Sequence, residues 1–152
     1  MFELRPILLA EDNPRDAELT CEALADCNLA NLVTLVRDGV EVMEFLRCEG
    51  KYTKRKPVNP AVMILDIKMP RMDGIDVLRA IRSDPVLKLI PVVMLTSSRE
   101  DQDLIRSYEL GINAYVVKPV KFLEFVEAVK QLGIFWALHN ELPPTGASTH
   151  EQ

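Results

Sequence analysis

The most restrictive feature of this sequence is a short apolar run that ends on an acid. Residues 62–65 are all apolar, and Asp66 follows them directly. Such a run is typical of a strand buried on both faces, as in a parallel sheet covered by helices. In open α/β sheets, ligand chemistry lies at the carboxyl ends of the strands. The sequence therefore predicts a carboxylate at that edge, where burial is unfavourable unless something pairs with it.

Further apolar runs alternate with segments of helical periodicity. Strands are expected over residues 6–10, 32–36, 61–66, 91–96 and 113–117. Helices are expected over about 14–27, 38–48, 73–84 and 98–110, and from about 121 to 140, with Asn13, Asp38 and Ser98 as caps and Gly111 in the left-handed position after the fourth helix. This alternation predicts an α/β fold, a doubly wound five-stranded parallel sheet with an extended last helix.

Length and charge restrict the class of protein further. The 152 residues suit one domain, expected over 1–142, with a flexible tail over 143–152. A net charge of −5 argues against nucleic-acid binding. No signal peptide is expected at residues 1–5, and no apolar run approaches the length of a membrane span. Three cysteines without metal-ligand spacing, Cys21, Cys27 and Cys48, predict reduced thiols and a cytoplasmic location.

Polar residues occur where the expected strands end. The group consists of Glu11, Asp12, Asp66, Thr96 and Lys118. Because parallel strands all end on the same side of a sheet, these residues are expected to share one crevice. Two like charges ~4 Å apart repel by ~4 kcal/mol at an effective dielectric near ~20, so three carboxylates there require compensation. Carboxylate oxygens of this kind predict a bound Mg2+ (or Mn2+) ion.

The same residues fit the chemistry of an acyl phosphate. The Asp66 carboxylate can attack phosphorus, and a metal ion, the Lys118 ammonium and the Thr96 hydroxyl are what a doubly negative phosphoryl group needs. Each residue also has a plainer interpretation by itself. Glu11 and Asp12 can be a solvated loop or a helix cap, Thr96 an ordinary strand residue, and Lys118 a surface lysine. Their occurrence together at successive strand ends favours the functional interpretation.

Over about residues 5–138 these motifs resemble the receiver domain of two-component response regulators. The resemblance implies a (βα)5 flavodoxin-like receiver fold with Asp66 as the phosphoacceptor. It implies that Thr96 is the switch hydroxyl, Tyr115 the switch aromatic and Lys118 the family's lysine, followed by a cis peptide bond to Pro119. By the same resemblance, magnesium would be held by Asp12, Asp66 and the backbone carbonyl of Lys68, with Glu11 acting through water.

The resemblance also implies what the protein does. A receiver accepts a phosphoryl group from a sensor histidine kinase, catalyses only its own phosphorylation and dephosphorylation, and signals by changing its protein contacts. The loop before Pro60, the segment 107–110 and the ending 135–143 are similar to stand-alone regulators associated with phytochrome kinases. The tail after the last helix is too short for a DNA-binding or catalytic domain, so no nucleic acid and no membrane is expected as a partner.

The last expected helix has more apolar residues than one buried stripe needs. Phe122, Val126, Val129 and Gly133 are expected to face the sheet. A second apolar set is expected outside that face and consists of Phe125, Leu132, Phe135 and Trp136. An exposed patch of this kind predicts a homodimer interface, which the resemblance also suggests. The alternative is that the tail folds back over the patch.

Other classes remain as alternatives. A dinucleotide-binding domain would need Gly-x-Gly-x-x-Gly after the first strand, where residues 11–14 are Glu-Asp-Asn-Pro. An aspartyl-phosphate phosphatase also uses a strand-end Asp, but it normally carries a second acid where this chain has Lys68, and a cap insertion for which there is no room. A third alternative is an interaction module that is not phosphorylated. Addition of one phosphoryl mass, absent in Asp66→Asn, separates these classes.

Overall fold

The computed structural model describes residues 5–26, 33–97, 111–112 and 114–132, apart from the side chains of 129, 131 and 132. The strands are β1 (Ile7–Ala10), β2 (Val33–Val36), β3 (Val62–Asp66), β4 (Val92–Thr96) and β5 (Ala114–Val117). The α-helices are α1 (Pro14–Asp26), α2 (Gly39–Arg47), α3 (Gly74–Arg82) and α5 (Phe122–Leu132), and two 3-10 turns are η2 (Gly50–Tyr52) and η3 (Leu87–Leu89).

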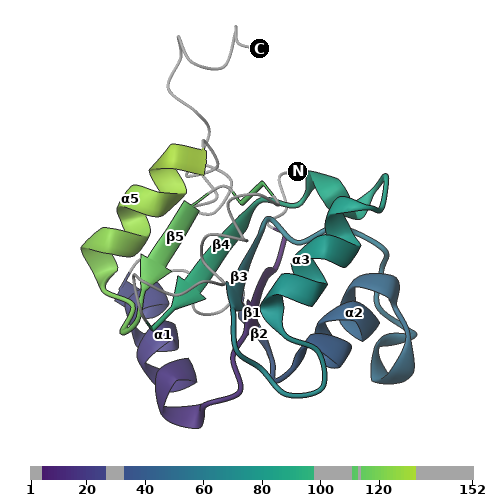
Figure 1. Cartoon of the computed structure of the whole chain (residues 1–152), viewed down its shortest axis with the longest axis horizontal. Helices are drawn as coiled ribbons and strands as arrows, with labels where there is room; N and C mark the ends of the chain where they lie inside the picture. The colour runs from purple at the N-terminus through teal and green to yellow at the C-terminus, as the bar shows by residue number, and fades with distance from the viewer. Residues whose placement is uncertain (1–4, 27–32, 98–110, 113, 133–152) are drawn as a thin grey trace, which may run out of the picture.

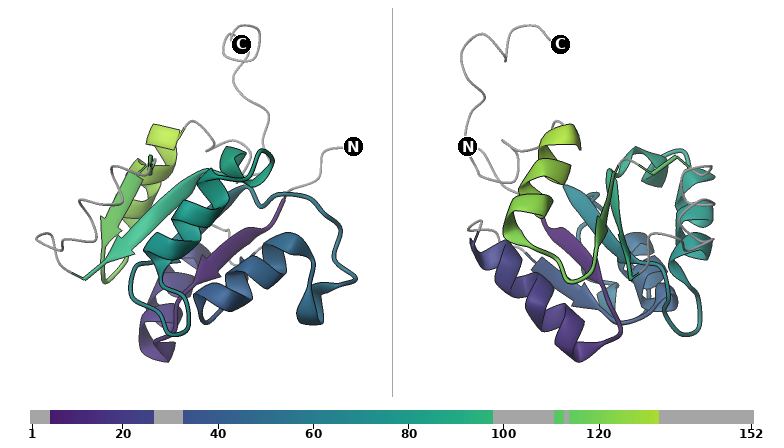
Figure 2. Two further views of the ribbon diagram at one scale, coloured as in Figure 1. Left: turned by 45° about the vertical axis from the view of Figure 1, so that its right-hand side comes forward. Right: turned by 60° about the vertical axis from the view of Figure 1, so that its left-hand side comes forward.

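The five strands form one parallel sheet in the order β2-β1-β3-β4-β5. Helices α2 and α3 cover one face, and α1 and α5 cover the other (Figure 1; Figure 2). Every residue of the central strands β1, β3 and β4 is buried, as the uninterrupted apolar runs predict. The predicted doubly wound α/β fold is confirmed.

Side-chain caps set where three helices begin. The Asn13 side chain accepts a hydrogen bond from the Asp16 backbone N–H at 2.9 Å, and Pro14 takes the first helical position of α1. Asp38 caps α2 and Asp73 caps α3 in the same way, each at 2.8 Å. All three caps follow carboxyl ends of strands, so helix starts and strand ends gather at one edge of the sheet.

The core divides into two clusters because alternate residues of a strand point to opposite faces. Leu8 and Met63 pack with α2 and α3, whereas Ile7 and Val62 pack with α1 and α5. Ile75, Leu78 and Ile81 are all buried, so the predicted inner face of α3 is confirmed.

The prediction for the last helix is wrong in part. Phe125 was expected outside the buried face of α5, but it is only 1% exposed and packs in the core with Ala128. Phe122, expected to face the sheet, is 39% exposed, and Leu123 is 74% exposed. The buried face of α5 is therefore rotated relative to the prediction, which had to choose between two apolar sets on a helix rich in apolar residues.

Several predictions lie outside the described residues. They are the fourth helix with its Ser98 cap, the motif at 107–110, the continuation of the last helix to 140, and the interface residues Phe135 and Trp136; the Leu132 side chain is outside the description as well. Gly111 does have positive φ, +78°, as predicted. Cys21 and Cys48 are free thiols, and Cys27 lies in an undescribed segment.

Residues 49–60 form a basic linker between α2 and β3, and part of this linker packs against α2. Tyr52 of η2 contacts the Phe45 ring edge-on, with centroids 5.1 Å apart. Arg55 lies over the same ring at 4.0 Å and donates a hydrogen bond from Nε to the Phe45 carbonyl. The linker is thereby tied to α2.

Candidate functional site

A cavity of about 530 Å³ lies at the carboxyl ends of the strands. Its lining includes all five polar residues that the sequence places at strand ends: Glu11, Asp12, Asp66, Thr96 and Lys118. Asp16, Lys68 and Ser97 line it as well. The prediction that these strand ends share one crevice is confirmed.

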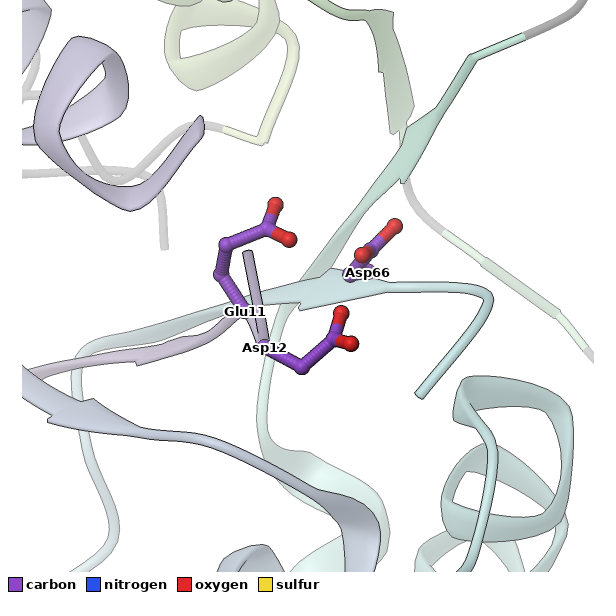
Figure 3. A group of neighbouring side chains, drawn as sticks. All are labelled: Glu11, Asp12 and Asp66. Carbon is purple, nitrogen blue, oxygen red and sulfur yellow. The ribbon is translucent and has the colours of Figure 1, made fainter. Parts of the chain in front are cut away.

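Three carboxylates converge within this cavity. Glu11 and Asp12 follow β1, and Asp66 ends β3, the strand that pairs directly with β1. One carboxylate oxygen from each lies within 4.8 Å of the others, and Figure 3 shows the groups gathered around one space. Glu11 is fully buried and Asp66 is 4% exposed, while Asp12 is exposed. The site is therefore buried on one side and open to solvent on the other.

The tight connection after β3 holds Asp66 in place. The Gly74 N–H donates a hydrogen bond to the Ile67 carbonyl at 2.7 Å, which folds the β3–α3 loop back on itself. A Cβ atom at Gly74 would overlap the Asp66 carbonyl. Only glycine therefore lets α3 begin this close to the end of β3.

Lys118 supplies a cation to this acidic group. Its Nζ lies 3.2 Å from Glu11 Oε1, 3.2 Å from Asp66 Oδ2 and 3.0 Å from Asp16 Oδ2. Burial lowers the Lys118 pKa, but Asp16, Asp66 and Glu11 together raise it above its ordinary value. Lys118 is therefore a charged ammonium that three carboxylates share.

Asp16 is a site residue that sequence reasoning missed. It lies in the first turn of α1, where an acid is usually explained by the helix dipole. In the structure its carboxylate also reaches Lys118 across the cavity. The sequence contained one indication of this position, the Asn13 cap, because it places the first turn of α1 beside the end of β1.

Among the described residues of the lining, the four acids outnumber the two lysines. Burial and the neighbouring Asp66 together raise the pKa of Glu11 to about 7, although the Asn13 backbone and Lys118 act in the opposite direction. Burial also raises the Asp66 pKa, although Lys118 acts in the opposite direction. Without a further cation, the site holds its negative charge at a free-energy cost.

The donor set fits a hard divalent cation. Mg2+ and Mn2+ prefer oxygen ligands, and Mg2+ commonly takes one or two carboxylates and retains water. The exposed Asp12 leaves one side open to solvent, as such an ion requires. The receiver resemblance adds the backbone carbonyl of Lys68, a residue of the same cavity lining. The site thus fits the predicted metal.

Thr96 and Tyr115, the two residues of the switch prediction, lie on the paired strands β4 and β5. Thr96 ends β4, is 1% exposed and pairs with Val117 of β5. Tyr115 lies two residues before Val117, so its side chain and that of Thr96 are on the same face of the sheet. Tyr115 is 37% exposed. The Lys118 N–H donates to the Thr96 carbonyl at 2.8 Å, and the Lys118–Pro119 peptide is cis, as the resemblance implies.

Residues 7–130 match the family model of the response regulator receiver domain. Among curated proteins, the response regulator Rcp1 of Synechocystis sp. is 37% identical over 137 residues, covering 90% of this chain and 92% of that protein.

Solved structures give a similar result. The bacteriophytochrome response regulator AtBRR is 58% identical, with a TM-score of 0.83 over 91% of this chain and 99% of that one. The phosphorylated cyanobacterial phytochrome response regulator RcpA is 39% identical, with a TM-score of 0.73 over 93% and 100%. The Mn2+-bound form of Rcp1 has a TM-score of 0.71, with 36% identity over 92% and 99%. Within the described part of the chain, no helix is both long and apolar enough to cross a membrane.

Proposed function

This chain belongs to the response regulator receiver domain family, and from that premise we propose that it is a single-domain response regulator phosphorylated on Asp66. The observation that carries the proposal is the convergence of Glu11, Asp12, Asp66 and Lys118 in one cavity at the carboxyl ends of the strands. The matched relatives cover over nine-tenths of the chain, which supports a receiver domain over residues 1–142.

The reaction is a transfer of one phosphoryl group. A carboxylate oxygen of Asp66 attacks phosphorus in a phosphohistidine, forming a P–O bond as the P–N bond breaks and the imidazole nitrogen keeps the electron pair. Asp66 suits this role because it ends a buried strand and faces an open cavity.

Two residues of the chain stabilise the new phosphoryl group. The Lys118 ammonium already contacts Asp66 Oδ2 at 3.2 Å, so it can hold a phosphoryl oxygen without a large movement. The Thr96 hydroxyl lies at the end of the adjacent strand β4 and supplies a donor. Hydrogen bonds to charged groups are about twice as strong as neutral ones, so a dianionic group attracts both.

Asp12, Asp66 and the Lys68 backbone carbonyl would hold the metal, and Glu11 would act through water. When bound, Mg2+ or Mn2+ neutralises charge on the phosphoryl oxygens. Rcp1 has been solved with Mn2+ bound and RcpA in its phosphorylated form, so both states occur in proteins similar to this one.

The partner proposed for this chain is a sensor histidine kinase of the phytochrome type. Its support is the similarity to bacteriophytochrome and cyanobacterial phytochrome response regulators. A cytoplasmic location follows from such a partner, and the free thiols of Cys21 and Cys48 support it.

The output is a change of surface at β5. Phosphorylation draws the Thr96 hydroxyl toward Asp66, which opens space for Tyr115 to turn inward on the same face of the sheet. This is a population shift, and it requires that the two states differ by a few kcal/mol. A beryllofluoride complex in which Thr96 and Tyr115 keep their present positions would remove this step.

The phosphorylation test is a mass measurement. Acetyl phosphate with magnesium is expected to add one phosphoryl group to the full chain, and Asp66→Asn is expected to abolish the addition. Asp76→Asn removes an exposed acid of α3 outside the cavity and is the matched control. Chelation is expected to stop labelling, and Asp12→Asn to slow it. Labelling that survives both Asp66→Asn and chelation would overturn the proposal.

A second proposal is a homodimer through the side formed by β5 and α5. Phe125 is buried and does not contribute, but Tyr115, Phe122 and Leu123 leave apolar surface exposed there. Leu132, Phe135 and Trp136 continue the same sequence segment. Phe135→Glu with Trp136→Glu is expected to convert a dimer to a folded monomer in sedimentation. A wild type that stays monomeric with and without phosphorylation contradicts the dimer.

A further inference from the structure

A second cavity, of about 310 Å³, lies at the opposite edge of the sheet from the phosphorylation site. It lies beside the residues that precede β1, the edge strand β2, and the basic linker after α2. Arg5 and Pro6, which line this cavity, come directly before β1, whereas Glu11 and Asp12, which line the first cavity, come directly after it. The two cavities therefore lie at opposite ends of β1.

The charges of the two cavities are opposite. The first is lined by four carboxylates, whereas the described residues around the second include the cations Arg5, Arg55 and Lys56 and no carboxylate. This concentration of positive charge occurs in a chain whose net charge is −5. Within the described residues, neither Arg5 nor Lys56 forms a salt bridge.

Arg55 is held in place before any ligand arrives. Its Nε donates to the Phe45 carbonyl at 2.9 Å, and its Nη1 donates to the Val58 carbonyl at 3.1 Å. The guanidinium also lies 4.0 Å from the centre of the Phe45 ring. A guanidinium has five N–H groups, so donors remain for a ligand after these two bonds. A fixed donor costs less ordering on binding than a mobile side chain.

The rest of the lining is largely apolar. Phe45 is 3% exposed and forms part of the wall, and Val58, which is 43% exposed, stands beside the cations. An exposed valine next to these cations has no role in the phosphorylation chemistry. A volume of this size is at the lower end of ordinary ligand pockets, about 300–1,000 Å³.

From this arrangement we propose that the second cavity binds a small anion that carries an apolar group, such as a phosphate or carboxylate joined to a ring. The anionic end pairs with Arg5, Arg55 and Lys56. The apolar end packs on Phe45 and Val58. An arginine fork suits phosphate and carboxylate oxygens because both can accept two parallel hydrogen bonds.

The probe is phenyl phosphate, titrated into the 15N-labelled full chain without magnesium. Saturable shifts are expected at the amides of Thr34, Lys56 and Val58, which line the cavity, and not at Asp66 or Thr96. Inorganic phosphate and benzyl alcohol each supply one half of the ligand and are expected to bind about tenfold or more weakly than phenyl phosphate.

The variant is the double substitution Arg5→Gln with Lys56→Gln, which leaves the packed Arg55 in place. It is expected to weaken binding by about tenfold or more, because charge-assisted hydrogen bonds are lost. Lys88→Gln removes an exposed lysine of η3 outside this lining and is the matched control, expected to bind like wild type.

Four results overturn the proposal. Shifts that do not saturate mean general attraction to a basic surface. Shifts that the double variant leaves unchanged mean that Arg5 and Lys56 do not bind the anion. Shifts confined to Thr96 and Lys118 mean that the anion enters the first cavity. Tighter binding of an acidic peptide containing phenylalanine than of phenyl phosphate assigns the cavity to a protein partner instead.

Discussion

The guanidinium of Arg71 holds the carboxylate of Asp38 through two hydrogen bonds, from Nε to Oδ2 at 2.9 Å and from Nη2 to Oδ1 at 3.1 Å. Arg71 lies in the β3–α3 loop, three residues after Lys68, and Asp38 caps α2. Arg71 also has positive φ, +67°, which is unusual for a residue with a side chain. The pair joins the loop beside Asp66 to the start of α2.

Arg71→Ala is expected to destabilise the protein by about 1 kcal/mol, because it removes the bidentate pair and keeps the left-handed backbone. Arg71→Gly also removes the pair but relieves the backbone, and it is expected to be more stable than Arg71→Ala by about 1 kcal/mol. Urea unfolding of both variants measures the difference. Equal midpoints would show that the backbone at residue 71 is not strained.

Lys118→Met is expected to destabilise the metal-free protein by roughly 3 kcal/mol, because Glu11 and Asp66 lose their buried cation. Magnesium is expected to stabilise this variant more than the wild type, since it then replaces the missing charge. Urea unfolding with and without magnesium tests both statements.

The control for that experiment is Lys68→Met, which removes an exposed lysine from the same cavity. Its cost is expected to be below about 1 kcal/mol. A Lys118→Met protein as stable as wild type without metal would contradict the shared-ammonium description of the site.

The variants Gly74→Ala and Gly111→Ala distinguish the effect of steric overlap by a new Cβ atom from the effect of backbone conformation. A Cβ at Gly74 meets the Asp66 carbonyl, whereas at Gly111 it meets open space but with φ of +78°. Gly74→Ala is expected to cost about 1–3 kcal/mol and to slow phosphorylation of Asp66, because α3 must move away from β3.

Gly111→Ala is expected to cost about 1 kcal/mol and to leave the phosphorylation rate unchanged. Unfolding midpoints and labelling rates with acetyl phosphate give both readouts. If the two variants slow labelling equally, the contact between Gly74 and the Asp66 carbonyl has no special role.

The Glu41 carboxylate predicts a pH effect at the linker. Burial raises the Glu41 pKa. Hydrogen bonds from Tyr52, Lys51 and the Arg37 backbone together lower it by a larger amount, so the net pKa lies below its ordinary value. A carboxyl group with a lowered folded pKa stabilises the fold above its unfolded pKa. That stabilisation disappears as pH falls through the folded pKa.

Tyr52→Phe keeps the ring on Phe45 but removes the 2.7 Å hydrogen bond to Glu41. Its cost is expected to be about 1–2 kcal/mol at neutral pH and to become smaller as pH falls through the lowered pKa of Glu41 and the carboxylate is protonated. Unfolding measured at neutral pH and across the acid range tests this. In a Glu41→Gln background the pH dependence should vanish, and its persistence would assign the effect to another group.

Much of the site follows from the sequence because one rule places it. An apolar run that ends in a polar residue marks where a buried strand reaches the sheet edge, and parallel strands all end on the same side. Asp66 and Thr96 were located by this rule alone. The family resemblance added roles for Lys68 and Tyr115, which have no such local signal.

The remaining features depend on how elements pack. The Asn13 cap indicates where α1 begins, but the contact between Asp16 and Lys118 depends on how α1 packs at the cavity. Phe125 is buried because of the way α5 packs against α1 and β5. When a helix has more apolar residues than one buried face needs, its sequence does not determine which of them face the core.

Local sequence thus determined the strands, the capped helix starts and the edge where the polar residues gather, because periodicity and capping act over a few residues. Tertiary structure decided which carboxylates share Lys118, that Arg71 joins Asp38, and that Arg55 packs on Phe45 beside a second cavity. Those contacts join residues distant in sequence, and the packing of whole elements brings them together.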